Sequence, residues 1–419
     1  MKLNRYVIAG FLSIIFLSDA VFADSSVVRI PLKTFTKPAQ DLLSDKGHEL
    51  SIADLTRLFS EGYDLSKLQP VENKYWQNYA NRKHSRTKWS NQKLSAVDEG
   101  LHKTMPNFDV GVDYDADMGA NRDLGFYSIL VKPSSVKASE NTQRYVLTLG
   151  QQIHASLLRS ALLRKLGYYQ ESPKYYSKLK LNFESKIEKE NFINSAFCET
   201  GPSEVAIDCL SITPFKTDKK PNEYLSHIDD KSLYVHGVYL EKMNPEVPSL
   251  FDGLVPATGS LIPYFSQSRA YRSLIVPFVI ADIGESLNRF STECATIRDG
   301  IAYMSYPFSG YFQDTDHTDV KWALRRVTQL TDQDWDEIID ASKLHPSLKQ
   351  LVKAKVLLRT KDCIEVFFDE EKINVTDKNS KSFQKIKNFL DNNQKYKEQL
   401  INYLEPDYNF IKSITFYED

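Results

Sequence analysis

RYVLTLGQQIHASLLRSALLRKLGYYQESPKYYSKLKLNF, residues 144–183, is the stretch of sequence that decides the fold. It predicts a short apolar strand, an amphipathic helix, a glycine stop and a second strand. The apolar residues of the helix recur at helical spacing, so that one stripe faces a core: Ile153, Leu157, Leu158, Ala161 and Leu162. Polar residues such as Ser156 and Ser160 fill the other side. Gly167 stands where a left-handed cap ends a helix.

Further strand patterns lie on both sides of this stretch. The alternating FDVGVDYDAD (108–117) and the apolar GFYSILVKP (125–133) are joined by a turn-prone segment, which predicts an antiparallel hairpin. The segment SLYVHGVYLEK (232–242) predicts another strand. The apolar run in RSLIVPFVIADIG (272–284) predicts a buried strand that ends at Asp282.

Helical patterns dominate the last third of the chain. Thr318 is predicted to cap one helix, and Thr331 with Asp334 is predicted to cap the next. Pro346 starts a third helix, and short connections predict antiparallel packed neighbours. The predicted fold class is therefore α+β, with a mixed or antiparallel sheet, a core amphipathic helix and a mostly helical C-terminal lobe.

Composition and pattern divide the chain into five segments. A signal peptide comes first, followed by an N-terminal extension that contains a short helix, capped by Ser51 and Asp54, and a basic and aromatic run. A sheet-containing lobe, a mainly helical lobe and a lysine-rich helical tail follow. The predicted boundaries are 1–23, 24–105, 106–250, 251–368 and 369–419.

The first segment has the three parts of a cleavable signal peptide. Lys2 and Arg5 supply the positive charge, residues 6–17 are apolar, and residues 21–23 form a small-residue cleavage site. No later stretch has the length and apolarity of a membrane span. We therefore expect an exported, soluble protein of the periplasm or the extracellular space.

The overall charge and the common motifs exclude several classes of function. A formal net charge of −2 gives no long-range attraction to nucleic acid or membrane. The chain lacks the G-x-S-x-G, H-E-x-x-H, Walker and G-x-G-x-x-G motifs, so no cofactor is indicated. The densest group of acids around a histidine (Asp314, Asp316, His317 and Asp319) precedes a helix, where acids serve the helix dipole.

The four cysteines are predicted to form disulfides, because an exported protein enters an oxidising compartment that allows them. Cys198 and Cys209 enclose a short polar segment with a Gly-Pro turn that brings the two thiols together. Cys294 and Cys363 would then pair by elimination, although four cysteines allow three connectivities. Buried free thiols are the alternative.

Three acids in the predicted hairpin form a candidate metal site. Asp113, Asp115 and Asp117 share a two-residue spacing, which points them the same way along a strand. Their mutual repulsion favours a cation or nearby basic groups. The D-x-D-x-D opening is typical of a calcium loop, but Gly119 falls one position late and Leu124 replaces the glutamate. The alternative is a solvated hairpin tip.

The N-terminal extension contains a candidate binding surface. Basic and aromatic residues alternate in it, among them Arg82, Lys83, Arg86, Lys88 and Trp89. Such a mixture suits nucleic acid, an anionic lipid head group or a sugar polymer, through charge and stacking. The alternative is a surface segment whose aromatic rings hold it to the core while its lysines stay in water.

The order of several segments resembles the plan of atypical kinases of the spore-coat CotH and HipA-like kinds. The segments are FYSILVKP, QQIHASLLRSALLRKLGY, YYSKLKLNF and VIADIGESL, followed by a helical lobe. The resemblance implies that Lys132 pairs with phosphates and that Asp282 binds a metal ion. The helix offers Gln151 and Gln152 in place of a glutamate, and no H-x-D motif precedes Asp282.

Two functions follow from these observations. The first is an exported binding or structural protein that interacts with a partner or ligand, and it is favoured because missing motifs weigh more than a shared order of elements. The alternative is a kinase-like enzyme or a pseudokinase that uses Lys132 and Asp282.

Overall fold

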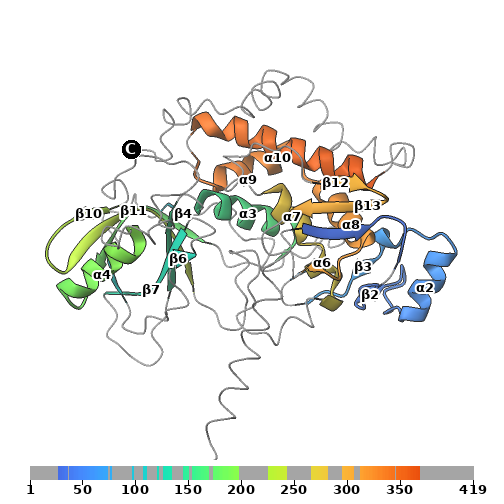
Figure 1. The fold of residues 1–419 in the computed structure, drawn as a ribbon, viewed down its shortest axis with the longest axis horizontal. Coiled ribbons are helices and arrows are strands. Elements are labelled where there is room, and N and C mark those ends of the chain that lie inside the picture. The colour runs from blue at the N-terminus through green and yellow to red at the C-terminus, as the bar shows by residue number, and fades with distance from the viewer. Residues whose placement is uncertain are drawn as a thin grey trace, which may run out of the picture.

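A strand-rich lobe and a helical lobe lie side by side, with helix α3 between them (Figure 1). The computed structural model describes residues 27–35, 37–73, 76–77, 97–98, 107–110, 120–121, 126–134, 145–150, 153–168, 173–197, 225–242, 266–281, 295–305, 312–344 and 346–368. The predicted signal peptide and the predicted tail lie outside these residues. The α+β class predicted from the sequence is confirmed.

The strand-rich lobe contains an eight-stranded sheet within the described residues and helix α4. Its elements are β4 (Val97–Asp98), β5 (Asn107–Val110), β6 (Ala120–Asn121), β7 (Phe126–Pro133), β8 (Tyr145–Gly150), β9 (Lys174–Asn182), α4 (Lys186–Phe197), β10 (Leu225–His227) and β11 (Ser232–Lys242). The antiparallel pairing of β5 with β7, with Phe108 opposite Pro133, confirms the predicted pairing of these two segments. The strands predicted from the YYSKLKLNF and SLYVHGVYLEK segments are also confirmed, as β9 and β11.

Five strands of this sheet close into a ring. β11 pairs antiparallel with both β8 and β9, β7 lies between β8 and β5, and β5 pairs parallel with β9. Alternate residues of these strands fill a core, as expected of strands with one buried face: Ile129, Val131, Leu147, Leu149, Leu179, Leu181, Leu233 and Val235. The strand-rich lobe therefore has a core of its own.

Helix α3 (Ile153–Leu166) joins the two lobes and ends at Gly167, whose φ of 101° fits the predicted left-handed cap. Its residues Ile153 and Leu157 pack with Tyr175 and Tyr239 of the sheet. Its other apolar side chains enter the core of the helical lobe.

The expectation of one apolar stripe on α3, with a polar opposite side, is wrong. Ser156 and Ser160 are only 5% and 3% exposed, because a second lobe covers the side that the sequence assigned to solvent. The hydroxyl group of Ser160 has no hydrogen-bond partner among the described residues.

The helical lobe combines five helices with a three-stranded antiparallel sheet, counting the described residues. Its elements are β1 (Val27–Pro31), α6 (Arg269–Arg272), α7 (Ile275–Ile280), β12 (Ala295–Arg298), β13 (Ile301–Ser305), α8 (His317–Val327), α9 (Asp332–Ala341) and α10 (Pro346–Phe367). The sheet order is β1-β13-β12. A single core spans the lobe and includes Phe278, Trp322, Leu324, Ile338 and Val356.

Two predictions in this lobe are wrong. The segment predicted as a strand ending at Asp282 contains helix α7. The prediction failed because every residue from Ile275 to Ile280 is buried, and a short apolar run in the sequence does not distinguish a helix from a strand. Pro277 lies in the first turn, where a backbone N–H is not needed. Helix α8 begins at His317 and is capped by Asp316, two residues before the predicted cap.

A small N-terminal module packs against the helical lobe (Figure 1). It consists of β2 (Leu42–Leu43), α2 (Ile52–Ser60), the 3-10 helix η1 (Leu65–Lys67) and β3 (Gln69–Pro70). The predicted capping box between Ser51 and Asp54 is confirmed, as is the one between Thr331 and Asp334 at α9. The module has its own apolar cluster, formed by Ala39, Leu42, Leu55, Leu65 and Leu68.

Candidate functional site

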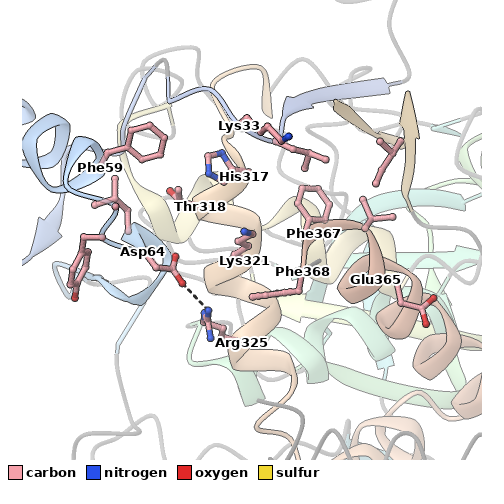
Figure 2. Close-up of a pocket in the computed structure, with 16 residues that line it drawn as sticks. Lys33, Phe59, Asp64, His317, Thr318, Lys321, Arg325, Glu365, Phe367 and Phe368 are labelled. Carbon is pink, nitrogen blue, oxygen red and sulfur yellow. Dashed lines mark hydrogen bonds and ion pairs between the residues drawn. The ribbon is translucent and has the colours of Figure 1, made fainter. Parts of the chain in front are cut away.

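One face of α8 lines a cavity between the N-terminal module and the end of α10 (Figure 2). His317, Lys321 and Arg325 recur every four residues, which places them on the same side of the helix. The cavity has a volume of about 790 Å³. Pockets for small molecules measure roughly 300 to 1,000 Å³, so this cavity has the size of a ligand site.

Aromatic side chains supply much of the apolar lining of this α8 cavity. Phe59 and Tyr63 come from the N-terminal module, and Phe367 and Phe368 from the end of α10. Phe59 stacks on Phe35, with ring centroids 4.8 Å apart, so its ring is held in place from behind. Rings fixed in this way offer flat apolar surface without losing further side-chain freedom when a ligand binds.

Charged side chains of both signs line the α8 cavity, and cations are in excess. The cations are Lys33, Lys321 and Arg325, and the carboxylates are Asp64 and Glu365. Arg325 binds Asp64 with a nitrogen-to-oxygen distance of 2.9 Å. Since this pair is neutral as a whole, Lys33 and Lys321 against Glu365 leave the lining with net positive charge.

The Arg325–Asp64 pair is further held by Ser66, whose hydroxyl group accepts a hydrogen bond from Arg325 Nε at 3.1 Å. Burial acts to raise the pKa of Asp64, but the hydrogen bonds from Ser66 and the charge of Arg325 outweigh burial and lower this pKa. Asp64 is therefore ionised at neutral pH, and Arg325 serves to attach the N-terminal module to α8.

Lys321 lies over an aromatic ring of the lining. Its Nζ is 5.5 Å from the centroid of Phe368, and the Arg325 guanidinium carbon is 5.0 Å from the same centroid. Contacts of this kind attract a cation to the ring face and limit the positions that its side chain adopts. The ammonium group of Lys321 is therefore held at the cavity wall.

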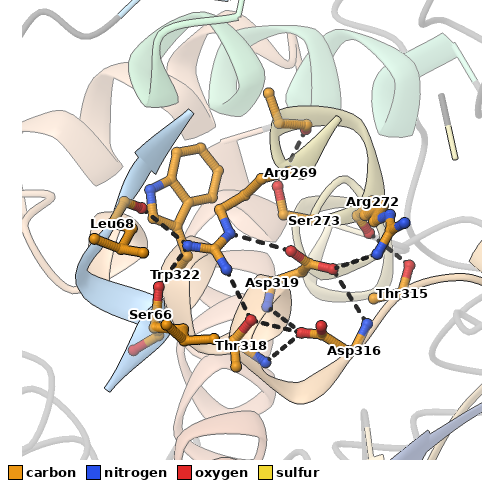
Figure 3. A network of polar contacts seen from close by, with 12 residues as sticks. Ser66, Leu68, Arg269, Arg272, Ser273, Thr315, Asp316, Thr318, Asp319 and Trp322 are labelled. Carbon is orange, nitrogen blue, oxygen red and sulfur yellow. Dashed lines mark hydrogen bonds and ion pairs between the residues drawn. The ribbon is translucent and has the colours of Figure 1, made fainter. Parts of the chain in front are cut away.

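The opposite side of α8 carries a buried ion-pair network (Figure 3). The side chains of Arg269 and Asp319 are both 0% exposed, and Arg269 Nε donates to Asp319 Oδ1 at 3.1 Å. The remaining nitrogens of the Arg269 guanidinium donate to the Leu65 and Leu68 carbonyls, at 2.6 and 2.9 Å, and to the Thr318 hydroxyl group, at 2.7 Å. Arg269 thereby ties the N-terminal module to the helical lobe.

Asp316 and Asp319 bond to each other's backbone at the start of α8. Asp316 Oδ1 accepts from the Thr318 and Asp319 backbone N–H groups at 2.7 and 3.1 Å. Burial raises the pKa of Asp319 to about 7, reinforced by Asp316 and opposed by Arg269 and Arg272. The acids of this group cap a helix and bind arginines, which agrees with their interpretation from the sequence.

The residues implied by the kinase resemblance are not brought together within the described chain. Lys132 lies on β7, opposite Asp109 of β5 in the strand register. Asp282 lies outside the described residues. The segment that precedes Asp282 is helix α7, where the resemblance expects a strand. The kinase interpretation therefore stays a prediction.

Cys363 is the predicted disulfide cysteine that the structure describes. It is fully buried on α10. The backbone N–H of Ala295 donates to the carboxylate of Asp362 at 3.1 Å, so the neighbours of Cys294 and Cys363 in sequence are in contact. This contact supports the predicted Cys294–Cys363 pair, which itself stays a prediction.

The other candidate residues from the sequence lie outside the described residues. They are the cysteines Cys198, Cys209 and Cys294, the acids Asp113, Asp115 and Asp117, and the binding candidates Arg82, Lys83, Arg86, Lys88 and Trp89. In the described part of the chain, no group of three or more acidic, histidine or cysteine side chains is arranged to hold a metal ion. Nor does any described helix combine the length and apolarity of a membrane span.

The α8 cavity was missed by the sequence analysis. The sequence feature that could have pointed to it is the four-residue spacing of His317, Lys321 and Arg325, which places them on one face of a helix. The walls contributed by the N-terminal module and by α10 are far away in sequence, and no local pattern indicates them.

Comparisons of the chain with family models, with curated proteins and with solved structures found no match.

Proposed function

We propose that the protein is an exported binding protein whose α8 cavity holds a small organic anion. The observation that carries this proposal is the lining of the cavity, which combines four aromatic side chains with an excess of cations in about 790 Å³. Such a lining suits a molecule that has an apolar body and one acidic group. It is the site chemistry, and no likeness to another protein, that supports the proposal.

Lys33 and Lys321 are the groups that would bind the acid. Lys33 follows β1 at the top of the cavity in the view of Figure 2, and Lys321 projects from α8 below it. Two cations from different elements can bind one carboxylate from two sides. Charge-assisted hydrogen bonds of this kind are about twice as strong as neutral ones.

Phe59 and Phe367 would hold the apolar body of the ligand. In the view of Figure 2 Phe59 lies to the left of Lys321 and Phe367 lies to its right. A flat ring that contacts these side chains buries apolar surface, which is worth roughly 25 cal/mol per Å² removed from water. The site therefore favours an aromatic acid over a short aliphatic acid.

Isothermal titration calorimetry with phenylacetate tests the proposal, and 2-phenylethanol serves as the uncharged analogue. We expect phenylacetate to bind and 2-phenylethanol to bind at least about tenfold more weakly, because it lacks the charge that the two lysines meet. Lys321→Met is expected to remove this preference for the acid.

Lys349→Met is the matched control for this variant, since Lys349 pairs with Asp340 at 3.2 Å and does not line the cavity. It removes the same charge and should leave phenylacetate binding unchanged. The proposal is wrong if phenylacetate shows no binding at millimolar concentration, or if it binds equally to the wild type and to Lys321→Met.

A further inference from the structure

Ile297 of β12 is a large apolar side chain that lies open to the α8 cavity. It lines the cavity and is 52% exposed. In the described part of the chain, β12 is the edge strand of the sheet β1-β13-β12, and it packs beside α10 (Figure 1). A single exposed apolar side chain on a surface needs no explanation, so the face of the sheet on which Ile297 stands decides what its exposure means.

The strand register places Ile297 on the face of the sheet that is turned to the core. Ile297 is paired with Ala302 of β13, and Ala302 is paired with Ile30 of β1. The side chains of residues directly opposite each other on neighbouring strands point to the same face. Ala302 and Ile30 are both 0% exposed and belong to the core of the helical lobe. Ile297 therefore continues a row of core residues, but it faces the cavity where its two neighbours in the row face packed protein.

Leu32 and Val366 make the same end of the cavity apolar. Both line the cavity and pack against the core of the helical lobe. The backbone N–H of Leu32 donates to the Gly300 carbonyl at 3.0 Å, which holds Leu32 beside the turn between β12 and β13. Leu32 directly precedes Lys33, so this apolar end begins next to one of the two lysines proposed to bind the acid. A ligand group that fills it is favoured if it is apolar, because a polar group would leave its bonds to water.

We infer that the ligand is an aromatic acid with an alkyl substituent on its ring, and that this substituent covers Ile297. The carboxylate then meets Lys33 and Lys321, and the ring contacts Phe367. The inference rests on the proposed function and adds to it the length and the apolar end of the ligand. A volume of about 790 Å³ agrees with it, because phenylacetate is much smaller than the drug-sized ligands that fill pockets of this size.

Calorimetry with three acids tests the inference: phenylacetate, 4-propylphenylacetate and 4-(methoxymethyl)phenylacetate. The second adds a propyl chain, and the third has a chain of the same length with an oxygen atom in place of one methylene group. We expect 4-propylphenylacetate to bind at least about tenfold tighter than phenylacetate, because each buried methylene group tightens binding roughly fourfold. The ether should lose most of this gain, since its oxygen leaves water for an apolar surrounding.

Substitutions of Ile297 locate the effect. Ile297→Thr keeps a β-branched side chain on the edge strand but shortens it and adds a hydroxyl group. The preference for the propyl acid should fall at least about threefold in this variant, while phenylacetate binds as before and thereby shows that the cavity is intact. Ile297→Val removes one methylene group and should lower the preference less.

Ile52→Thr is the matched control. Ile52 is 54% exposed on α2 and does not line the cavity, so the same substitution there should change the affinity of none of the three acids. If Ile297→Thr does not bind phenylacetate, Ile297→Val decides, and a preference as large as that of the wild type overturns the inference.

The other outcomes separate the inference from the proposed function. Equal binding of phenylacetate and 4-propylphenylacetate to the wild type overturns the inference and leaves the anion site standing. A gain that is equal in the wild type and in Ile297→Thr also overturns it, because the propyl group then lies elsewhere, as does an ether that binds as tightly as the propyl acid. Absence of binding by all three acids overturns both proposals.

Discussion

The two sides of α8 carry similar side chains but differ in what surrounds them. On one side Arg269 and Asp319 are completely buried and bound to each other and to the N-terminal module. On the other side Lys321 and His317 line a cavity of about 790 Å³. The charges that protein groups enclose are held by structural partners, whereas Lys321 on the other side lines a cavity, where we propose that it meets a ligand.

The largest effect is expected from Arg269→Met, which removes the cation of the enclosed side. Asp319 would remain buried without its closest guanidinium, and two module carbonyls would lose their donor. Breaking a buried pair in this way costs about 3–5 kcal/mol. Urea unfolding measures the loss, and a cost below about 1 kcal/mol would show that the network is not structural.

The next largest effect is a change of the free energy of unfolding with pH, which we expect from the titration of Asp319. Its carboxyl group titrates near pH 4 when unfolded and at about pH 7 when folded, because burial raises its pKa. The folded state therefore binds the proton more tightly, and this contribution to the free energy of unfolding falls as pH rises from 4 to 7 and then levels off.

Asp319→Asn isolates this contribution, since His317 and His236 titrate in the same range with lowered pKa values and act in the opposite direction. The stability of the wild type relative to the variant is expected to decline between pH 4 and pH 7. A difference that stays constant over this range would contradict the shifted pKa.

A smaller effect is expected at the cap of α8. Asp316→Ala removes the oxygen that accepts from two backbone N–H groups, and loss of such a cap costs about 1 kcal/mol, within a range of 0.5–2. Asp316→Asn keeps an acceptor in the same position and should cost less. Thermal unfolding of the two variants compares them, and equal losses would assign the effect to charge instead of capping.

The smallest effect is expected from Arg325→Met, on the cavity side of the helix. The side chains of Arg325 and Asp64 are 22% and 37% exposed, so water screens their attraction. Pairs of this kind contribute about 0–1 kcal/mol. Urea unfolding under the conditions used for Arg269→Met should therefore show a much smaller loss of the free energy of unfolding for Arg325→Met. Equal losses in the two variants would contradict the distinction between the two sides of α8.

The sequence predicted the elements whose signals are local. The capping boxes at Ser51 and Thr331, the stop at Gly167 and the strands β9 and β11 depend on neighbouring residues, and all are confirmed. Helix α7 was predicted as a strand because a short buried apolar run has no polar side to show its period. The buried serines of α3 were placed in solvent because the second lobe is not visible from the helix itself.

The candidate site could not be predicted in the same way. Lys33, Tyr63, Lys321 and Phe368 come together from four separate parts of the chain. The spacing of His317 and Lys321 shows only that they share a helix face, and a charged face is usually solvated. The burial of His317 and the cavity beside it arise from tertiary packing, which the periodicity of one helix does not contain.

A crystal structure of the protein with 4-bromophenylacetate tests the central claim most directly, because anomalous scattering locates the bromine atom independently of the refined coordinates. The account predicts bromine within the α8 cavity and the carboxylate at hydrogen-bonding distance, about 3 Å, from Lys33 or Lys321. Bromine elsewhere on the molecule, with the α8 cavity unoccupied at saturating concentration, would contradict it.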